Sequence, residues 1–381
     1  MKILYHHRVA SKDGQYVHIE EIIKSFKKAG HNIILVAPSM GENQDFGGDG
    51  GLVSKLKMNL PNWLYEVVEF LYSFWAFAKL SMAIVKHKPT FIYERYNLFN
   101  PSGIWAKKLF RLPLLLEINA PLLEERSKYD GLSLSALAKW TQNYTWRNAD
   151  YVLPVTNVLA EFQRAIGIPE ERIKVIPNGI NKEAFIDTQY PNQLKVDVSD
   201  NIVVGFVGFC RDWHGLDKIV KLLSLPRNEK LFFLLIGDGP AVPGIRKLAE
   251  DLGLKDRIHI TGLVERDQMP AWLQSIDIAL QPAVVAYASP LKMLEYMAMG
   301  KAIVAPDQPN IRELLEDNVN ALLFDPSNQQ SFIDACQKLA TDEPLRKCLA
   351  TNAAASISEK ALLWDANAET IIKLAQIKSN D

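Results

Sequence analysis

One helix start in the C-terminal half of the chain combines a hydroxyl, an ammonium group and a carboxylate. Ser289 and Pro290 predict an N-cap and a first helical position, and Gly300 predicts the end of the helix. The N–H groups of a first helical turn have no partners within the helix, so this end attracts anions such as phosphate. Lys292 would add a positive charge there, and Glu295 would project from the same face, where its carboxylate could bind two sugar hydroxyls. The pattern indicates a site for a nucleotide diphosphate sugar, although an ordinary surface Lys–Glu pair would have the same spacing.

Two apolar runs flank this helix and must position it. Residues 278–280 precede it and residues 302–305 follow it, and each run predicts a short buried strand. Together they form one βαβ unit with a crossover of about a dozen residues. The chain opens with the same alternation, since residues 3–5 and 33–37 predict strands and residues 16–29 an amphipathic helix, a Rossmann-like arrangement.

The segment SPLKMLEYMAMGKAIVA, which begins at Ser289, closely resembles the donor-binding motif of retaining glycosyltransferases with the GT-B fold, in particular the GT4 family. The resemblance implies that Glu295 binds the ribose of the donor. It also implies that the helix start holds the diphosphate through Ser289, Pro290, Leu291 and Lys292. The family motif has a first glutamate, usually assigned to the hexose hydroxyls, where this chain has Tyr287, so the identity of the sugar stays open.

A second phosphate-binding turn is expected in the stretch IVVGFVGFCRDWHG, where Gly208 would let a phosphate approach the backbone closely. Members of the family usually carry an arginine directly after this glycine and a lysine directly before the next one. This chain has Phe209 and His214 at those places, and Arg211 would supply the displaced positive charge. The Trp-His-Gly sequence resembles a variant found in a subset of the family.

The same resemblance assigns further donor contacts. Gly237 lies in a turn that matches the Gly-Asp-Gly-Pro of the family, and Gly14 in the first loop would approach the diphosphate from across a cleft. The backbone at Leu263 and Val264 would read the edge of the base, without deciding between uracil and guanine.

Candidate acceptor contacts follow two expected strands, FIYERY at 91–96 and LLLEIN at 114–119. Arg95 and Asn119 stand at the ends of these strands, where parallel sheets bind ligands. His18, just inside the first helix, could also contact an acceptor, or it could be an exposed helix histidine.

Composition excludes several other classes. The net charge is −1, with 43 Lys+Arg and 44 Asp+Glu, which argues against a dedicated nucleic-acid binder. The three cysteines have no metal-ligand spacing and no Asp-x-Asp stands out, so we expect neither a metal site nor a cofactor. The opening MKILYHH predicts a strand rather than a signal peptide, and we expect a cytoplasmic protein.

The most hydrophobic segment, residues 63–85, is long enough to cross a membrane but contains Glu66, Glu69 and Lys79. It predicts one or two amphipathic helices rather than a membrane span. Its many aromatic residues could pack in the core, line an acceptor groove or lie on a membrane surface. Residues 1–120 carry 15 Lys+Arg against 10 Asp+Glu, which would suit the inner face of the cell membrane.

These observations predict an α/β protein with the GT-B fold, in which two Rossmann-like domains face each other across a cleft. Residues 1–190, with a returning helix at about 364–381, would form the acceptor domain, and residues 200–363 the donor domain. The resemblance implies transfer of a hexose from a UDP- or GDP-linked donor to a hydroxyl, with retention, in the synthesis of a surface polysaccharide or lipid-linked glycan. The alternatives are transfer to a soluble metabolite, a nucleotide-sugar epimerase and an inactive sugar-nucleotide sensor.

Overall fold

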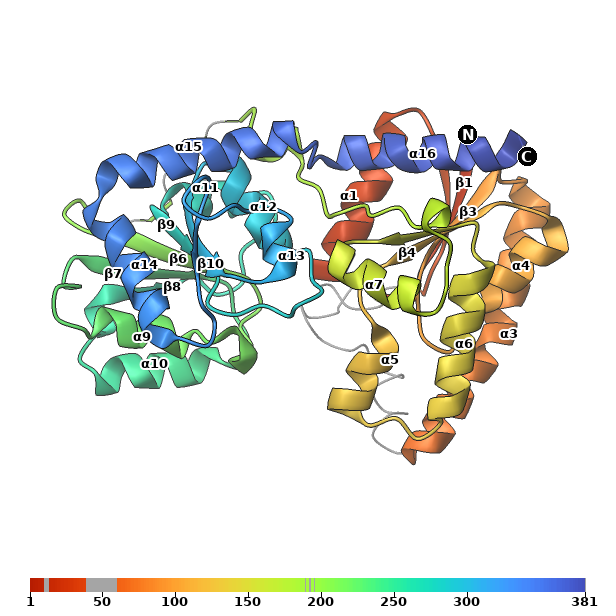
Figure 1. Ribbon diagram of the computed structural model, residues 1–381, viewed down its shortest axis with the longest axis horizontal. Helices are drawn as coiled ribbons and strands as arrows, with labels where there is room; N and C mark the ends of the chain where they lie inside the picture. Colours follow the sequence, from red (N-terminus) through yellow and green to blue (C-terminus); the bar gives the residue numbers. More distant parts are fainter. Residues whose placement is uncertain (10–13, 39–59, 189, 192, 195, 381) are drawn as a thin grey trace. The chain divides into compact units, whose positions relative to one another are not determined.

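A computed structural model describes residues 1–9, 14–38, 60–188, 190–191, 193–194 and 196–380, and it divides the chain into two units. The first unit comprises residues 1–177 and 364–381, and the second comprises residues 178–363. Each unit is built on one parallel sheet covered by helices, which confirms the predicted α/β class (Figure 1).

The first unit has a five-stranded sheet in the order β2-β1-β3-β4-β5, with every pair parallel. Its strands are β1 (Lys2–His6), β2 (Asn32–Val36), β3 (Phe91–Arg95), β4 (Leu114–Ile118) and β5 (Tyr151–Pro154). Its helices are α1 (Gly14–Lys28), α3 (Asn62–His87), α4 (Ser102–Phe110), α5 (Leu122–Glu125), the π-helix η1 (Arg126–Asp130), α6 (Ser135–Asn148), α7 (Asn157–Ala165), the 3-10 turn η2 (Glu170–Arg172) and α16 (Trp364–Asn380).

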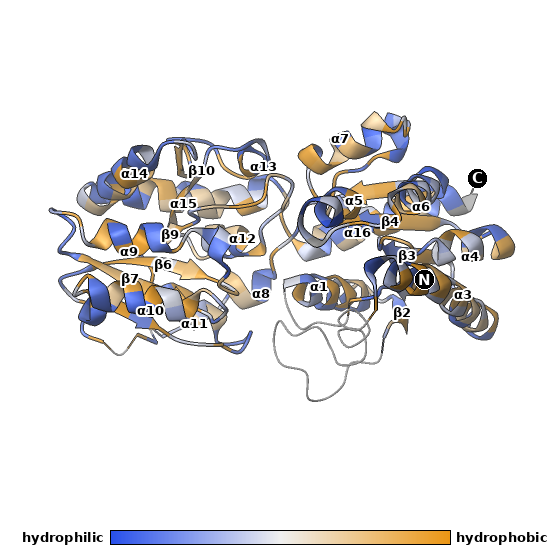
Figure 2. Cartoon of the chain, turned by 90° about the horizontal axis from the view of Figure 1, so that it is seen from below, coloured by the Kyte–Doolittle hydropathy of each residue, from blue (hydrophilic) through white to orange (hydrophobic). Residues whose placement is uncertain are grey.

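The second unit has a six-stranded parallel sheet in the order β11-β10-β9-β6-β7-β8. Its strands are β6 (Ile202–Val207), β7 (Leu231–Ile236), β8 (Ile258–Ile260), β9 (Ile278–Leu280), β10 (Ala302–Pro306) and β11 (Leu322–Phe324). Its helices are α8 (Lys182–Phe185), η3 (Asp212–His214), α9 (Asp217–Leu223), α10 (Val242–Asp251), η4 (Lys255–Arg257), α11 (Met269–Gln274), α12 (Leu291–Ala298), α13 (Pro309–Arg312), α14 (Gln329–Thr341) and α15 (Glu343–Glu359). Figure 2 shows strands such as β6 and β4 in the orange of apolar residues, as expected for strands covered on both faces.

The chain passes from the first unit to the second earlier than the sequence predicts. The boundary lies after Pro177, whereas the sequence predicted a first domain that extends to residue 190 and a second that begins at residue 200. The reason is that Ile180 donates a backbone hydrogen bond to Leu362, and that Ile180 and Phe185 are buried in the core of the second unit.

The last helix, α16, returns to the first unit and packs beside α1 (Figure 1). The Trp364 ring lies 4.8 Å from the His18 ring, centroid to centroid, and both residues are buried. On the surface of the same pair of helices, Lys28 binds Asp365 at 2.8 Å.

The apolar segment forms a single helix, α3, rather than two. Its buried residues include Glu66, Ser73 and Leu80, whereas large apolar side chains elsewhere on it are exposed, among them Phe74 and Val85. By length and composition alone α3 could cross a membrane, a property that core helices of soluble proteins share and that is weak evidence for a span.

Candidate functional site

Helix α12 starts one residue later than the sequence predicts, and the Ser289 hydroxyl does not cap it. Pro290, with ψ 119°, occupies the N-cap position, and no side chain caps the helix. The Ser289 hydroxyl instead accepts a hydrogen bond from the N–H of Asn178 at 3.1 Å, and the Ser289 carbonyl accepts one from the Asn178 side chain at 2.5 Å. The assignment of Ser289 as N-cap and Pro290 as first helical residue is therefore wrong, because the hydroxyl is engaged elsewhere. The Met293 N–H donates to the Pro290 carbonyl at 3.0 Å, which leaves the N–H groups of Leu291 and Lys292 as the first-turn donors for an anion.

The body of α12 is fixed to the end of β6. The hydroxyl oxygen of Tyr296 accepts a hydrogen bond from the N–H of Val207 at 2.9 Å, and Tyr296 is fully buried. This contact places the first turn of α12 beside the loop that follows β6, which begins at Gly208.

The turns after β6 and β7 pack backbone against backbone, and glycine is required for it. A Cβ on Gly237 would lie 2.1 Å from the Gly208 carbonyl oxygen, and one on Gly239 would lie 2.4 Å from the Cys210 carbonyl oxygen. Gly208 and Gly237 also have positive φ, 134° and 139°. The sequence predicted Gly208 as a phosphate-approach position and, by resemblance, Gly237 as a donor contact, and the structure brings the two glycines into contact.

Lys292 reaches from α12 over the turn after β6. A Cβ on Gly208 would lie 3.0 Å from Lys292 Nζ, and Nζ lies 3.9 Å from the centroid of the Phe206 ring. Burial against these apolar surroundings lowers the pKa of Lys292 to about 7. An ammonium group held in this way favours an anionic ligand, because a phosphate would restore the charge balance that the protein does not supply.

His214 is a buried neutral histidine rather than a substitute cation. Its Nδ1 accepts a hydrogen bond from the N–H of Arg211 at 3.1 Å, and its ring lies against Phe206 and Trp213. Burial, with the nearby charge of Lys292, lowers the pKa of His214 to about 3. Since Nδ1 accepts, the ring proton is on Nε2, which can donate to a phosphate oxygen. The sequence analysis assigned His214 to the donor site without a charge state, and its role there stays a prediction.

Arg211 is exposed, and its guanidinium carbon lies 5.3 Å from the centroid of the Phe209 ring. No ion pair of Arg211 occurs among the described residues, so its charge stays available beside the loop. Phe209, which replaces the arginine usual in the family, thus supports the displaced arginine as a stacking surface.

The carboxylate of Glu295 is 3% exposed and pairs with the Arg266 guanidinium. Arg266 in turn lies over the Phe185 ring at 5.1 Å. Sequence reasoning missed this partner because Arg266 and Glu295 lie 29 positions apart and no spacing rule connects them. Arg266 fixes the direction of the carboxylate that is assigned to the ribose.

The other predicted donor residues fall around the same elements. Leu263 is exposed and Val264 half-buried in the loop after β8, and Tyr287 is half-buried in the loop before α12. Gly14 is the first residue of α1, and residues 10–13 of the loop before it lie outside the described part of the chain. The binding roles of all four residues remain predictions.

In the first unit, the three predicted acceptor residues converge on one carboxylate, Glu117, which is 2% exposed. His18 Nε2 lies 3.0 Å from Oε2, Arg95 donates to Oε1 at 2.6 Å, and the Asn119 amide donates to Oε1. Tyr93 adds a hydrogen bond at 2.8 Å. Although burial opposes ionisation, the charges of His18 and Arg95 hold the pKa of Glu117 well below its usual range.

This convergence changes the interpretation of two of the three residues. His18 and Arg95 are buried and direct their donors to Glu117. The alternative that His18 is an exposed helix histidine is therefore wrong. Asn119 is half-buried. Acceptor binding by these residues stays a prediction. Among the described residues, no group of three or more His, Cys, Asp or Glu side chains is arranged to hold a metal ion.

Two parallel-sheet units, one with a buried lysine at a helix start and a paired carboxylate one turn further on, are the arrangement expected of a protein that binds a nucleotide sugar. Two family models match the chain: glycosyltransferase family 4 over residues 12–184 and glycosyl transferases group 1 over residues 189–356. The chain belongs to the GT4-like glycosyltransferases with the GT-B fold.

Individual relatives are distant. The chain is 27% identical over 225 residues to the alpha-D-kanosaminyltransferase of Streptomyces kanamyceticus, covering 57% of this chain and 58% of that protein. It is 26% identical over 298 residues to the N,N'-diacetylbacillosaminyl-diphospho-undecaprenol alpha-1,3-N-acetylgalactosaminyltransferase of Campylobacter jejuni, covering 74% and 76%. The Anabaena protein Alr3699/HepE, solved in complex with UDP, superposes with a TM-score of 0.74 at 20% identity, covering 98% of this chain and 99% of that one. This last likeness concerns the fold.

Proposed function

We propose that the protein transfers a hexose from a UDP- or GDP-linked donor to a hydroxyl of a glycan or lipid-linked acceptor, with retention at the anomeric carbon. The observation that carries this proposal is Lys292, a lysine with a lowered pKa at the uncapped start of α12, against the glycine turn of Gly208. Family membership supports the glycosyltransferase class.

In the proposed reaction, the bond between the anomeric carbon and the diphosphate oxygen breaks, and a bond from the acceptor oxygen to the anomeric carbon forms on the same face. The acceptor proton moves to the departing diphosphate. The first-turn N–H groups of α12, Lys292, the Nε2–H of His214 and Arg211 would stabilise the charge that grows on the diphosphate. Glu295, directed by Arg266, would bind the ribose hydroxyls. Under this proposal turnover continues when divalent metals are chelated.

The proposed setting is the cytoplasmic face of the cell membrane. The name of the Campylobacter relative includes a diphospho-undecaprenol acceptor, and this chain exposes apolar side chains along α3. Peripheral association of the purified protein with vesicles containing anionic lipids would support this setting, and equal recovery with and without vesicles would refute it.

An inactive sugar-nucleotide sensor is the second candidate, because Tyr287 replaces the glutamate that relatives direct at the hexose. The two candidates share nucleotide binding and differ in turnover.

The first test is thermal unfolding of the protein with UDP, GDP, ADP and their sugar conjugates, since a ligand of the folded state raises its stability. We expect a selective rise with one base that is lost in Glu295→Ala and Lys292→Ala. The matched control is the surface pair on α15, where Lys347 lies 2.6 Å from Glu343, and Glu343→Ala or Lys347→Ala should keep the response. No response to any nucleotide would refute the site.

The second test incubates the bound sugar nucleotide with candidate glycan acceptors and follows the anomeric proton by NMR. Product with the donor's anomeric configuration supports a retaining transferase. Selective nucleotide binding with no transfer to any acceptor, and no hydrolysis of the donor, favours the sensor.

A further inference from the structure

A pocket in the first unit lies apart from the Glu117 cluster, at the ends of β3 and β4 where the strands enter their loops. It is walled by α3, the loop after β3 and the segment of α5 and η1, and its volume is about 340 Å³. The lining residues are Glu69, Asn97, Leu98, Leu122, Glu125, Arg126 and Tyr129. This volume is near the lower limit of about 300–1,000 Å³ for small-molecule sites, which suits a single ring better than a nucleotide.

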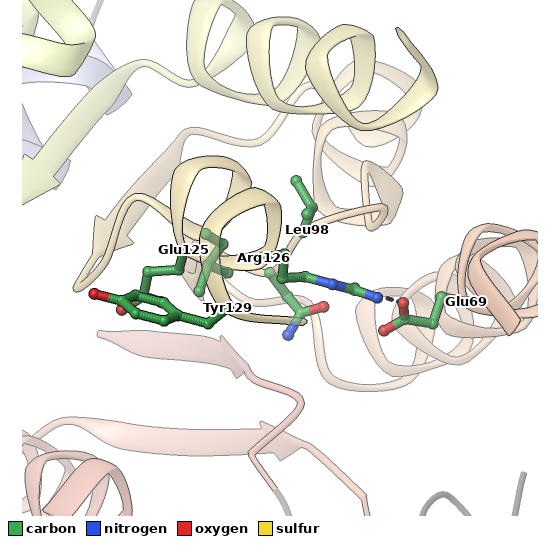
Figure 3. Close-up of a pocket in the computed structure, with 7 residues that line it drawn as sticks. Glu69, Leu98, Glu125, Arg126 and Tyr129 are labelled. Atoms are coloured by element: carbon green, nitrogen blue, oxygen red, sulfur yellow. Dashed lines mark hydrogen bonds and ion pairs between the residues drawn. The ribbon is translucent and has the colours of Figure 1, made fainter. Parts of the chain in front are cut away.

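The backbone that forms one wall is unusual. Helix α5 continues directly into the π-helix η1 (Arg126–Asp130), and Gly131, with φ 73°, follows it. The next turn is held by Glu66 of α3, whose carboxylate accepts hydrogen bonds from the N–H groups of Ser133 at 2.9 Å and Leu134 at 2.5 Å. π-helical turns are rare and occur frequently at functional sites. The wide turn brings both Arg126 and Tyr129 to the pocket (Figure 3).

The arginine that lines the pocket is already paired. Arg126 extends to Glu69 at 2.6 Å, as Figure 3 shows, and Arg8 donates to the Oδ1 of Asn97 at 3.1 Å. Glu125 adds a second carboxylate to the lining. Because Arg126 is already paired with Glu69, the described lining residues offer a phosphate no unpaired cation, and the pocket favours an uncharged ligand.

Hydrogen-bonding capacity remains for such a ligand. Glu69 Oε2 takes the bond from Arg126, and its Oε1 accepts none from a described residue. The Asn97 side-chain amide has its oxygen engaged by Arg8, and its Nδ2 donates to no described residue. One acceptor and one donor on neighbouring walls match the two roles that a sugar hydroxyl can play.

Tyr129 supplies an apolar surface at the pocket. Its side chain is 68% exposed, although a tyrosine ring normally buries most of its area, and Lys128 Nζ lies 5.1 Å from its centroid. An exposed ring beside carboxylate and amide groups is suited to packing against the C–H face of a pyranose while the polar groups bind its hydroxyls.

We propose that this pocket binds one uncharged pyranose ring of the acceptor glycan, with Tyr129 packed against the ring and Glu69 and Asn97 bound to its hydroxyls. That this ring belongs to the acceptor rests on the proposed transferase function, whereas the sugar site itself rests on the geometry of the pocket.

The test uses the full chain and saturation-transfer NMR with methyl α-glucopyranoside, methyl α-galactopyranoside, methyl α-mannopyranoside and methyl N-acetyl-α-glucosaminide, and with inorganic phosphate as the anionic probe in competition. We expect saturation of the ring protons of at least one glycoside, no displacement by phosphate, and about tenfold weaker binding in Tyr129→Ala. Tyr129→Phe keeps the ring and should bind as the parent does. Trp140→Ala removes an exposed aromatic side chain of α6 that does not line the pocket, and it should change nothing.

The proposal is overturned if no glycoside binds, if Tyr129→Ala binds as tightly as the parent, or if phosphate displaces the sugar. Nucleotide binding to Tyr129→Ala, measured by thermal unfolding, separates the two proposals. If Tyr129→Ala keeps both the nucleotide response and the glycoside affinity of the parent, only the pocket proposal is refuted. If the parent binds glycosides but no nucleotide, only the transferase proposal is refuted.

Discussion

The pKa of Lys292 makes nucleotide affinity depend on pH in a direction that can be worked out. In the free protein this pKa is about 7, below the ordinary 10.5, because the ammonium group is buried. A bound diphosphate favours the charged form and raises the pKa again, so binding takes up a proton. Affinity is therefore highest below the free pKa and falls as pH rises through and above it.

The size of the effect follows from the two pKa values. If the diphosphate restores the ordinary value, the dissociation constant rises about eightfold between pH 7.5 and 8.5, and about 0.9 proton is taken up at pH 8. This window lies above the second ionisation of a terminal phosphate, at about pH 6, so the ligand keeps its charge throughout.

Isothermal titration calorimetry with the nucleoside diphosphate that binds best, in two buffers with different ionisation enthalpies, measures both the dissociation constant and the number of protons taken up. Lys292→Arg should remove the pH dependence, because the guanidinium stays charged. Lys301 is the matched control, since it is also buried, with a pKa of about 8, and donates to the Gln274 carbonyl at 3.1 Å outside the site. Lys301→Arg should keep the slope of the parent. Affinity constant within about twofold over the window, without proton uptake, would refute the role of Lys292.

Two other predictions concern the elements around it. Gly237→Ala should destabilise the protein by about 2 kcal/mol or more in urea unfolding, because Gly237 has a positive φ and its added Cβ would meet the Gly208 carbonyl. The control is Gly244→Ala on α10, where the added Cβ meets nothing within 4 Å and the change should be neutral or stabilising. Equal effects of the two substitutions would contradict the close packing of the turns. Arg266→Gln leaves the buried carboxylate of Glu295 without its cation and should cost about 1–3 kcal/mol of stability and weaken nucleotide binding, while unchanged values for both would show that the pair positions nothing.

Local patterns were sufficient for most elements of the fold. Buried strands such as β4 and the helix of the donor motif follow from runs of apolar residues and from glycine at the helix end. The turn with Gly208 was predicted from the close approach that glycine allows and the turn with Gly237 from its resemblance to a family motif, and the structure adds that both glycines have positive φ and that their turns pack together.

What sequence could not provide were pairings between segments far apart in the chain. The bond between Asn178 and Ser289 joins residues 111 positions apart and decides that Ser289 does not cap α12. Asn178 lies in a Pro-Asn-Gly sequence, and nothing in that sequence indicates that its partner is Ser289. Likewise Arg95 was expected at an open strand end, and only the packed structure shows that it serves the buried charge of Glu117.

The return of α16 to the first unit has a consequence for synthesis of the chain. The second unit is one continuous stretch, whereas the first unit, although it begins the chain, lacks the helix that covers His18 until residues 364–380 are made. The first unit therefore cannot complete its fold before the second unit has been synthesised, unlike the usual order in which an N-terminal domain folds first. Until then, the His18 ring that pairs with the Glu117 carboxylate lacks the Trp364 ring that packs against it.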